Sequence, residues 1–504
     1  MRSLDGMLRS ITSRREWSVS GSTAERSPVS RGARDLVLAQ GAKFVLQFGS
    51  LAILSRILSP AEFGVVAMAT AIVALGEVVR DAGISTATIQ ASELPTALRS
   101  NLFWLSVAIG GVLSAALFVA APVVGRIYAN EAVVDVVRVL SCVFIIASLG
   151  AQYRASLVRG LRFRPVAVAD GMAYGVGALV AVLAALWGAG VWALVVQQIV
   201  IAIVTSAALA IASAWLPGRP RRHVGTRPIL RVGWNILLTQ AIGSLSRNAD
   251  ALVIGRYFGA SALGYYNRGF QLMMLPMSQI SGPATSVALP VLSRAREEPE
   301  RLRKLAERAQ SAFLVPLFVG IGLIVVLAPL IVQILLGDGW DRASDIVRIL
   351  GLGAAFQGAS YLSYWLFVST GQTGLHFRLT LATRPVLVCA LLVGAAFGMD
   401  GVAWAYSLST GGIWVASLYA LRATPGLRVG VFFRNAALLL FVHVGAVVIA
   451  LVVGGQSSSL VTSAVLGGSA YALAIIVGYL LVRDCRLAAV VAIEFIRSSI
   501  SKIG

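Results

Sequence analysis

The chain has 504 residues, of which 58% are hydrophobic and only 13% are charged, and its mean hydropathy is +0.83. Soluble domains carry about 25% charged residues, so these values exclude an ordinary soluble protein and predict a polytopic membrane protein. The net charge of +20 is carried mostly by arginines in short breaks between apolar runs. That placement is a topology signal and argues against nucleic-acid binding.

The chain begins with a polar, arginine-rich segment at residues 1–34, which we expect to be a disordered basic cytoplasmic tail. It has no apolar stretch of the kind that a signal peptide needs. Apolar runs long enough to cross a membrane follow. They predict about 14 transmembrane helices, at residues 36–57, 63–82, 100–122, 133–153, 166–187, 190–212, 229–252, 263–286, 309–333, 344–367, 376–397, 401–420, 433–453 and 461–482.

Two hydrophilic breaks stand out between these spans. The dense positive run Arg219–Arg231 marks the best domain boundary. Ser293–Arg308 predicts a short interfacial helix, on which Glu297/Arg301 and Glu300/Lys304 fall four residues apart and can pair. Most Lys and Arg fall in segments on the same side of the membrane as the amino terminus, which predicts that this side is cytoplasmic. An even number of spans returns the carboxyl end to that side, so both termini are predicted to be cytoplasmic, in the bacterial inner membrane.

An internal repeat organises the first twelve spans. Arg56 and Gly64 match Arg256 and Gly264 at an offset of 200 residues. Four further matches follow in order: Ala121-Pro122 with Ala328-Pro329, Asp135–Leu140 with Asp345–Leu350, Gly160–Arg164 with Gly374–Arg378, and Gly190-Val191 with Gly401-Val402. Six spans separate equivalent points, which predicts parallel repeats with the substrate path between two lobes.

The predicted fold is therefore an all-α polytopic membrane protein, with two parallel-repeat six-helix lobes plus two extra C-terminal helices. We expect these parts at residues 35–214 (N-lobe), 215–228 (cytoplasmic linker), 229–421 (C-lobe), 422–482 (spans 13 and 14) and 483–504 (interfacial C-terminal helix). The two extra spans are expected to pack outside the repeat and to line a groove for a lipid tail.

Four motifs carry a resemblance to a known family: Arg56–Gly64, Gly83 with Ile89-Gln90, Arg159–Phe163, and Asp250 with Gly255-Arg256, Gly264 and Tyr266. On these motifs the chain resembles the polysaccharide transport family of Wzx-type oligosaccharide-lipid flippases, in the multidrug/oligosaccharidyl-lipid/polysaccharide (MOP) exporter superfamily. The resemblance implies a carrier that moves an undecaprenyl-diphosphate-linked oligosaccharide to the periplasmic leaflet, for lipopolysaccharide or exopolysaccharide biosynthesis. Composition and periodicity do not indicate this substrate.

Such a cargo needs cationic side chains for phosphate, and amides or aromatic rings for sugars. The cavity candidates within or at the ends of spans are Lys43, Gln47, Arg80, Arg154, Gln197, Gln240, Gln271 and Gln357. Each has a plainer alternative: Lys43 can snorkel to the interface, the arginines can be positive-inside anchors, and the glutamines can bond neighbouring helices.

The candidates for a gate or for ion coupling are Asp250, Arg247, Arg56 and Asp170. Asp250 and Arg247 lie three residues apart and can pair on one helix face. Alternatively, Asp250 closes an outer gate with Arg56 or couples transport to H⁺ or Na⁺. Asp170 is expected to be a helix-start charge favoured by the helix dipole.

No metal, nucleotide or catalytic pattern is present, so we expect no cofactor and no enzymatic activity. The alternatives are a cation-coupled drug exporter of the multidrug and toxin extrusion (MATE) branch and a polysaccharide polymerase or ligase. The expected partners are the lipid-linked oligosaccharide, membrane lipids and the polysaccharide polymerase and export machinery.

Overall fold

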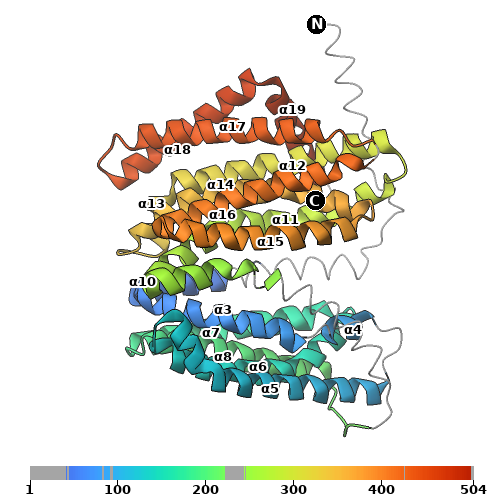
Figure 1. Cartoon of the computed structure of the whole chain (residues 1–504), viewed down its shortest axis with the longest axis vertical. Helices are drawn as coiled ribbons and strands as arrows, with labels where there is room; N and C mark the ends of the chain where they lie inside the picture. Colours follow the sequence, from blue (N-terminus) through green and yellow to red (C-terminus); the bar gives the residue numbers. More distant parts are fainter. Residues whose placement is uncertain are drawn as a thin grey trace.

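The structure is a computed structural model that describes residues 41, 45–81, 84–90, 95–221, 243–244, 246–424 and 426–500. All regular elements in these ranges are helices, and the long ones run side by side (Figure 1). A helix at Val45–Ile57 comes first. It is followed by α3 (Pro60–Asp81), α4 (Ile84–Gln90), α5 (Thr96–Tyr128), α6 (Ala132–Arg159), α7 (Phe163–Leu186), α8 (Val191–Ser213), α10 (Ala249–Met273), α11 (Leu275–Arg294), α12 (Pro299–Val326), α13 (Ala328–Leu335), α14 (Asp341–Ser369), α15 (Thr373–Ala395), α16 (Gly398–Ala420), the short 3-10 helix η1 (Leu421–Ala423), α17 (Val429–Gly454), α18 (Leu460–Leu481) and α19 (Arg483–Ile500).

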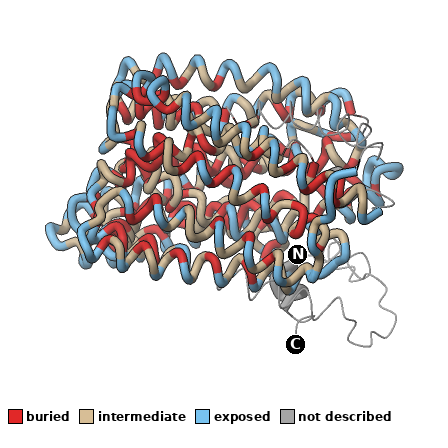
Figure 2. The backbone as a smooth tube through the Cα atoms, turned by 90° about the horizontal axis from the view of Figure 1, so that it is seen from below, coloured by how far each residue is buried: buried red, intermediate tan, exposed pale blue. Residues whose placement is uncertain are grey.

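The helices confirm the predicted all-α membrane fold. Within the described part, nine helices are long and apolar enough to cross a membrane. Helices α14 and α16 are equally long but carry more polar side chains. Buried residues gather along the middle of the bundle in Figure 2, whereas large apolar side chains such as Leu179, Val448 and Leu473 are exposed on its outside. Exposed apolar side chains at this density suit a hydrocarbon solvent.

The parallel repeat is also confirmed, because the same helix pairs pack in both halves. In the N-lobe α5 packs on α6, α6 on α8, and α7 on α8. In the C-lobe the corresponding helices do the same: α12 packs on α14, α14 on α16, and α15 on α16. Figure 1 shows the N-lobe in blue and teal below the C-lobe in yellow and orange, with α17 and α18 in red outside both.

The bundle has two ends, which we name after short helices. The α13 end holds α13 and the turn between α17 and α18, and it corresponds to the predicted periplasmic side. The α4 end holds α4 and α19, and it corresponds to the predicted cytoplasmic side. Figure 1 shows them on the left and on the right, respectively.

The lobes meet where α3 packs against α10, near the α13 end. A Cβ placed on Gly64 would lie 1.8 Å from the carbonyl oxygen of Ala260, and one placed on Gly264 would lie 2.0 Å from that of Pro60. Glycine is therefore required at both positions, since no side chain fits between the two backbones. Gly259, at φ 80° and ψ −175°, kinks α10 just before this contact.

The prediction of a separate interfacial helix at Ser293–Arg308 is wrong. Helix α11 runs to Arg294, a short turn follows, and α12 begins at Pro299 and continues as a membrane-spanning helix. Proline starts this helix because its missing N–H has no partner to lose at the first helical position.

The ion pairs of this segment also differ from the predicted ones. Arg301 contacts Glu298 at 2.9 Å, while Arg303 contacts Glu300 at 2.7 Å and Glu307 at 3.3 Å. Two of these three pairs are spaced by three residues, and the third is spaced by four. The pairs Glu297/Arg301 and Glu300/Lys304 do not form between the described side chains.

The linker between the lobes begins on the N-lobe. Asn101 Nδ2 of α5 donates to the carbonyl oxygen of Arg221 at 2.7 Å, and Trp104 Nε1 donates to that of Gly218 at 2.9 Å. The Arg99 guanidinium lies 3.8 Å from the ring centroid of Trp215. The described part of the linker is thus bound along α5. At the other end of the chain, α19 packs against α12.

Candidate functional site

The α13 end is closed by hydrogen bonds between the lobes. Arg56 Nη2 donates to the carbonyl oxygen of Ile334 at 2.7 Å, and Trp340 Nε1 donates to that of Ser55 at 2.9 Å. The Trp340 ring is buried and lies 5.5 Å from the ring of Phe63, between centroids. Together with the two glycines, these contacts seal the lobes against each other at this end.

Arg268 of α10 adds a further contact at this closed interface between the lobes, which we call the seam. Its guanidinium lies 4.2 Å from the centroid of the Phe63 ring on α3, which is a cation–π contact across the lobes. The same guanidinium also donates to Gln271 Oε1. The structure therefore places the predicted cavity residue Gln271 beside the seam, where it holds Arg268.

Asp250 lies in the first turn of α10 and is 7% exposed. Its Oδ1 accepts a hydrogen bond of 2.8 Å from the Ala251 N–H. Tyr128 of α5, Tyr266 of α10 and Tyr406 of α16 lie close enough to interact with it electrostatically. The carboxylate thus sits among phenols contributed by both lobes.

The predicted ion pairs of Asp250 are not found among the described residues. Arg247 is exposed, and the structure gives it no contact with the carboxylate. Arg56 binds a backbone carbonyl oxygen instead. The reason is that Asp250 faces the interior of the bundle, whereas both arginines lie nearer its surface.

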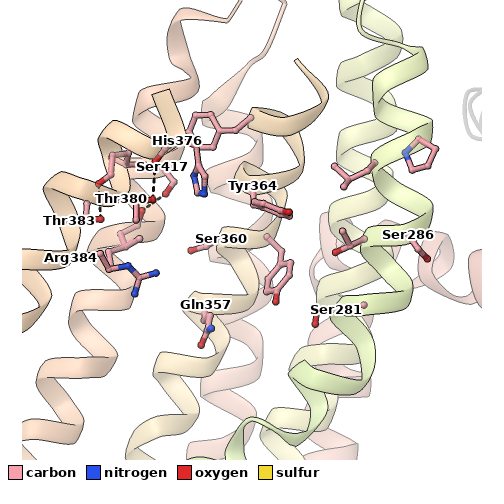
Figure 3. A pocket seen from close by; sticks show the side chains of 18 residues that line it. Ser281, Ser286, Gln357, Ser360, Tyr364, His376, Thr380, Thr383, Arg384 and Ser417 are labelled. Carbon is pink, nitrogen blue, oxygen red and sulfur yellow. Dashed lines mark hydrogen bonds between the residues drawn. The ribbon is translucent and has the colours of Figure 1, made fainter. Parts of the chain in front are cut away.

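A cavity of about 760 Å³ lies within the C-lobe. It is bounded by α11, α14, α15 and α16 (Figure 3). Its polar lining consists of Ser281, Thr285, Ser286, Gln357, Ser360, Tyr361, Tyr364, His376, Thr380, Thr383, Arg384 and Ser417. Hydroxyls, phenols and one amide thus face a common space inside a membrane bundle.

The charge of this cavity is basic. Arg384 points into the open space toward Gln357 in Figure 3, and His376 lies above it on α15. Arg384 is also an electrostatic neighbour of Tyr406 and Arg247, which links the cavity to the surroundings of Asp250. No Asp or Glu is among the described residues that line the cavity.

Of the predicted cavity residues, Gln357 lines this space, and the Tyr406 hydroxyl donates to its Oε1 at 3.5 Å. Gln197 lies in the N-lobe, where its Nε2 donates to Ser50 Oγ at 3.0 Å. Gln47 is exposed on the Val45–Ile57 helix. Lys43 and Gln240 lie outside the described residues.

The predicted arginines at the α4 end have different surroundings. Arg154 of α6 forms a two-point ion pair with Asp170 of α7, in which Nη1 lies 3.1 Å from Oδ2 and Nη2 contacts Oδ1. Arg80 ends α3, and its buried Nε has no hydrogen-bond partner among the described residues. The structure thus gives Arg154 a carboxylate partner, whereas the buried Nε of Arg80 has none within the described part of the chain.

The prediction that Asp170 is a helix-start charge is wrong. Helix α7 begins at Phe163, so Asp170 lies two turns inside it, beyond the region where the dipole favours an acid. Its position is explained by Arg154, which approaches from the neighbouring helix.

Sequence reasoning missed Arg384, His376, Tyr128 and Tyr406. Arg384 had a signal, since it stands in the interior of the predicted span 376–397, where a charge is costly and usually functional. The two tyrosines had no such signal, because they reach Asp250 from helices distant in the sequence.

Residues 53–345, more than half of the chain, match the family described as "Polysaccharide biosynthesis protein". The chain belongs to the polysaccharide biosynthesis protein family. This member is 26% identical over 426 residues to the succinoglycan biosynthesis transport protein ExoT of Rhizobium meliloti (strain 1021), covering 82% of this chain and 84% of ExoT. It is 22% identical over 365 residues to the lipopolysaccharide biosynthesis protein WzxC of Escherichia coli (strain K12), covering 71% and 73%.

The fold of this polysaccharide biosynthesis family member is shared with a solved flippase. The lipid II flippase MurJ, in an inward closed conformation, superposes with a TM-score of 0.68 at 12% sequence identity. The match covers 88% of this chain and 98% of MurJ. The family membership and this fold agree with the resemblance drawn from the motifs, and they identify a multi-pass membrane protein.

Proposed function

We propose that the protein is a flippase that moves an undecaprenyl-diphosphate-linked oligosaccharide from the cytoplasmic to the periplasmic leaflet of the bacterial inner membrane. The observation that carries this proposal is the C-lobe cavity, which is basic, rich in hydroxyls and enclosed by membrane helices. The relatives ExoT and WzxC are named for polysaccharide transport and biosynthesis, which supports the substrate class.

The cavity matches the chemistry of a lipid diphosphate carrying sugars. Arg384 offers a planar fork of N–H donors that suits phosphate oxygens. Tyr361 and Tyr364 present aromatic rings and hydroxyls for sugar faces, and the serines and threonines add further donors and acceptors. A volume of about 760 Å³ lies in the range of sites that enclose a ligand of several rings.

The closed α13 end supports alternating access. With that end sealed by the glycines and by Arg56 and Trp340, cargo reaches the cavity from the α4 end, which is cytoplasmic in the proposed topology. Arg80 at the α4 end of α3 is then positioned to attract the phosphates during loading. Opening requires α3 and α10 to separate.

Both termini lie on the cytoplasmic side in this arrangement. The flipped product would then pass to the polymerase on the periplasmic side.

Asp250 favours a second candidate, a cation-coupled exporter, because a buried carboxylate among phenols suits a proton or Na⁺ as ligand. The basic cavity argues against a cationic drug as cargo, since Arg384 would repel it. We therefore assign Asp250 to coupling or gating within the flippase.

The decisive experiment depletes the protein in its host and measures undecaprenyl-linked glycans by mass spectrometry. We expect the linked oligosaccharide to accumulate on the cytoplasmic side, and its absence would refute the flippase proposal. Complementation then tests the cavity: Arg384→Gln should fail to restore polymer export, whereas Arg378→Gln, an exposed arginine on the same helix, should restore it. Equal rescue by both variants would remove the C-lobe cavity from the transport path.

A further inference from the structure

A second cavity, of about 360 Å³, lies at the α13 end between the C-lobe and the α17–α18 hairpin. Its walls come from the junction of α12 and α13 around Leu327, from α14 through Arg348, and from the turn that joins α17 to α18. It shares no lining residue with the C-lobe cavity. It is therefore a separate site, and nothing in the transport proposal uses it.

Arg348 is the one charged side chain among the described residues that line this second cavity. In the N-lobe its repeat counterpart Arg138 pairs with Asp135 at 3.2 Å. In the C-lobe, Arg342 lies 3.3 Å from the matching carboxylate of Asp345. The repeat thus provides an ion pair for Arg138, while the same carboxylate is engaged elsewhere in the C-lobe.

Arg348 consequently retains unused donors. It forms no ion pair with another described residue, and its buried Nε–H has no hydrogen-bond acceptor in the described part of the chain. A buried N–H without an acceptor is unfavourable, so an acceptor from a ligand would stabilise the site. The ligand should be an anion, because a guanidinium stays charged.

The rest of the wall indicates what the anion is attached to. Ser457, Ser458 and Ser463 line the same cavity as Arg348 and supply hydroxyl groups, whereas Leu327 and Leu451 supply apolar surface. An arginine fork with adjacent hydroxyls suits the oxygens of a phosphate group. Apolar surface beside that group suits the glycerol and first acyl carbons of a lipid, and basic pockets between membrane helices bind lipid headgroups in this way.

We propose that this cavity binds the phosphate-bearing headgroup of an anionic phospholipid. The phosphate contacts Arg348 on α14 and the serines of the α17–α18 turn at the same time. Since α17 and α18 lie outside the repeat, the lipid joins the hairpin to the C-lobe. Its role is structural, and it is independent of the transported cargo.

The test uses the purified full-length protein in detergent and follows thermal unfolding as lipid is added. Phosphatidylglycerol should raise the Tm, whereas diacylglycerol and inorganic phosphate should not, because each lacks one half of the ligand. Arg348→Gln should weaken the apparent affinity for phosphatidylglycerol about tenfold or more, as expected for the loss of a charge-assisted hydrogen bond. The apparent affinity of Arg348→Lys for phosphatidylglycerol should lie between those of the unaltered protein and Arg348→Gln. Arg138→Gln is the matched control and should respond like the unaltered protein.

Three results would overturn the proposal. An unchanged response of Arg348→Gln would remove the arginine from the site, and an equal effect of diacylglycerol would show purely apolar binding. Saturation of the response by inorganic phosphate alone would make the ligand a soluble anion instead of a lipid. If Arg348→Gln does not fold, Ser458→Ala changes only an exposed turn and should still lower the affinity measurably. An affinity unchanged in that variant would count against the site.

Discussion

Replacing Gly64 by alanine should open the α13 end of the molecule. The new Cβ would lie 1.8 Å from the carbonyl oxygen of Ala260, and a backbone atom cannot rotate away from it. Non-bonded carbon and oxygen atoms stay about 3.3 Å apart, so α3 and α10 must separate by roughly 1.5 Å. Each lobe can remain folded, because the strain falls on the contact between them.

The size of the effect follows from the cost of overpacking, which is about 1–3 kcal/mol for an added methyl group in a tight contact. If that cost falls on the closed state alone, the equilibrium between closed and open shifts about 5- to 150-fold toward open. Gly264→Ala should act in the same direction, since its Cβ would lie 2.0 Å from the carbonyl oxygen of Pro60. Gly171→Ala on α7 is the matched control, because a Cβ there meets nothing within 4 Å.

Spin labels at the exposed positions Glu131 and Asp338, one in each lobe at the α13 end, report the separation by pulsed electron resonance. The native cysteines Cys142, Cys389 and Cys485 are first replaced by alanine. We expect a longer, broader distance distribution for Gly64→Ala than for the parent or for Gly171→Ala. Superimposable distributions for all three proteins would refute the argument that glycine holds this end closed.

Three further substitutions test the polar contacts. Asp250→Asn keeps an acceptor for the neighbouring N–H and removes the charge, so polymer export should fall about tenfold or more with little change in Tm; unchanged export would exclude a role for the charge. Trp340→Phe keeps an aromatic side chain but removes the N–H that donates to the Ser55 carbonyl oxygen and shrinks a buried ring, so thermal unfolding should show a loss of at least about 1 kcal/mol. A Tm equal to that of the parent would contradict this. A double-mutant cycle of Arg154→Ala and Asp170→Ala should give a coupling of about 0.5–1 kcal/mol, since the pair is partly exposed, and strict additivity would rule out the pairing.

Most of the spans could be predicted from the sequence because apolar length largely determines them. The predicted span 133–153, for example, lies within α6, which covers Ala132–Arg159. Helix ends were less certain, and ion pairs depend on them. Pro299 starts α12 in such a way that Arg301 meets Glu298, three residues before it, and not Glu297.

The site was harder to predict, because its partners are distant in the sequence. Arg56 lies at the α13 end, which is the periplasmic end only in the predicted topology, and its acceptor is the backbone carbonyl oxygen of Ile334, which carries no side-chain signal. Asp250 was identified as unusual among apolar residues, yet the phenols around it come from α5 and α16 as well as its own helix. Local spacing suggested Arg247 instead, because only neighbours along the chain are visible in a sequence.

The contact between α3 and α10 has the form of a symmetric homodimer interface. Gly64 packs on residue 260, and Gly264 packs on residue 60. At the repeat offset of 200 residues, position 60 corresponds to 260 and position 64 to 264, so the second contact is the first with the two lobes exchanged. In an isologous dimer, residue i of one subunit contacts residue j of the other, and residue j of the first subunit contacts residue i of the second. A six-helix subunit with one such glycine would make both contacts by pairing with a copy of itself. The closure of the α13 end thus has the form of a two-fold interface within a single chain.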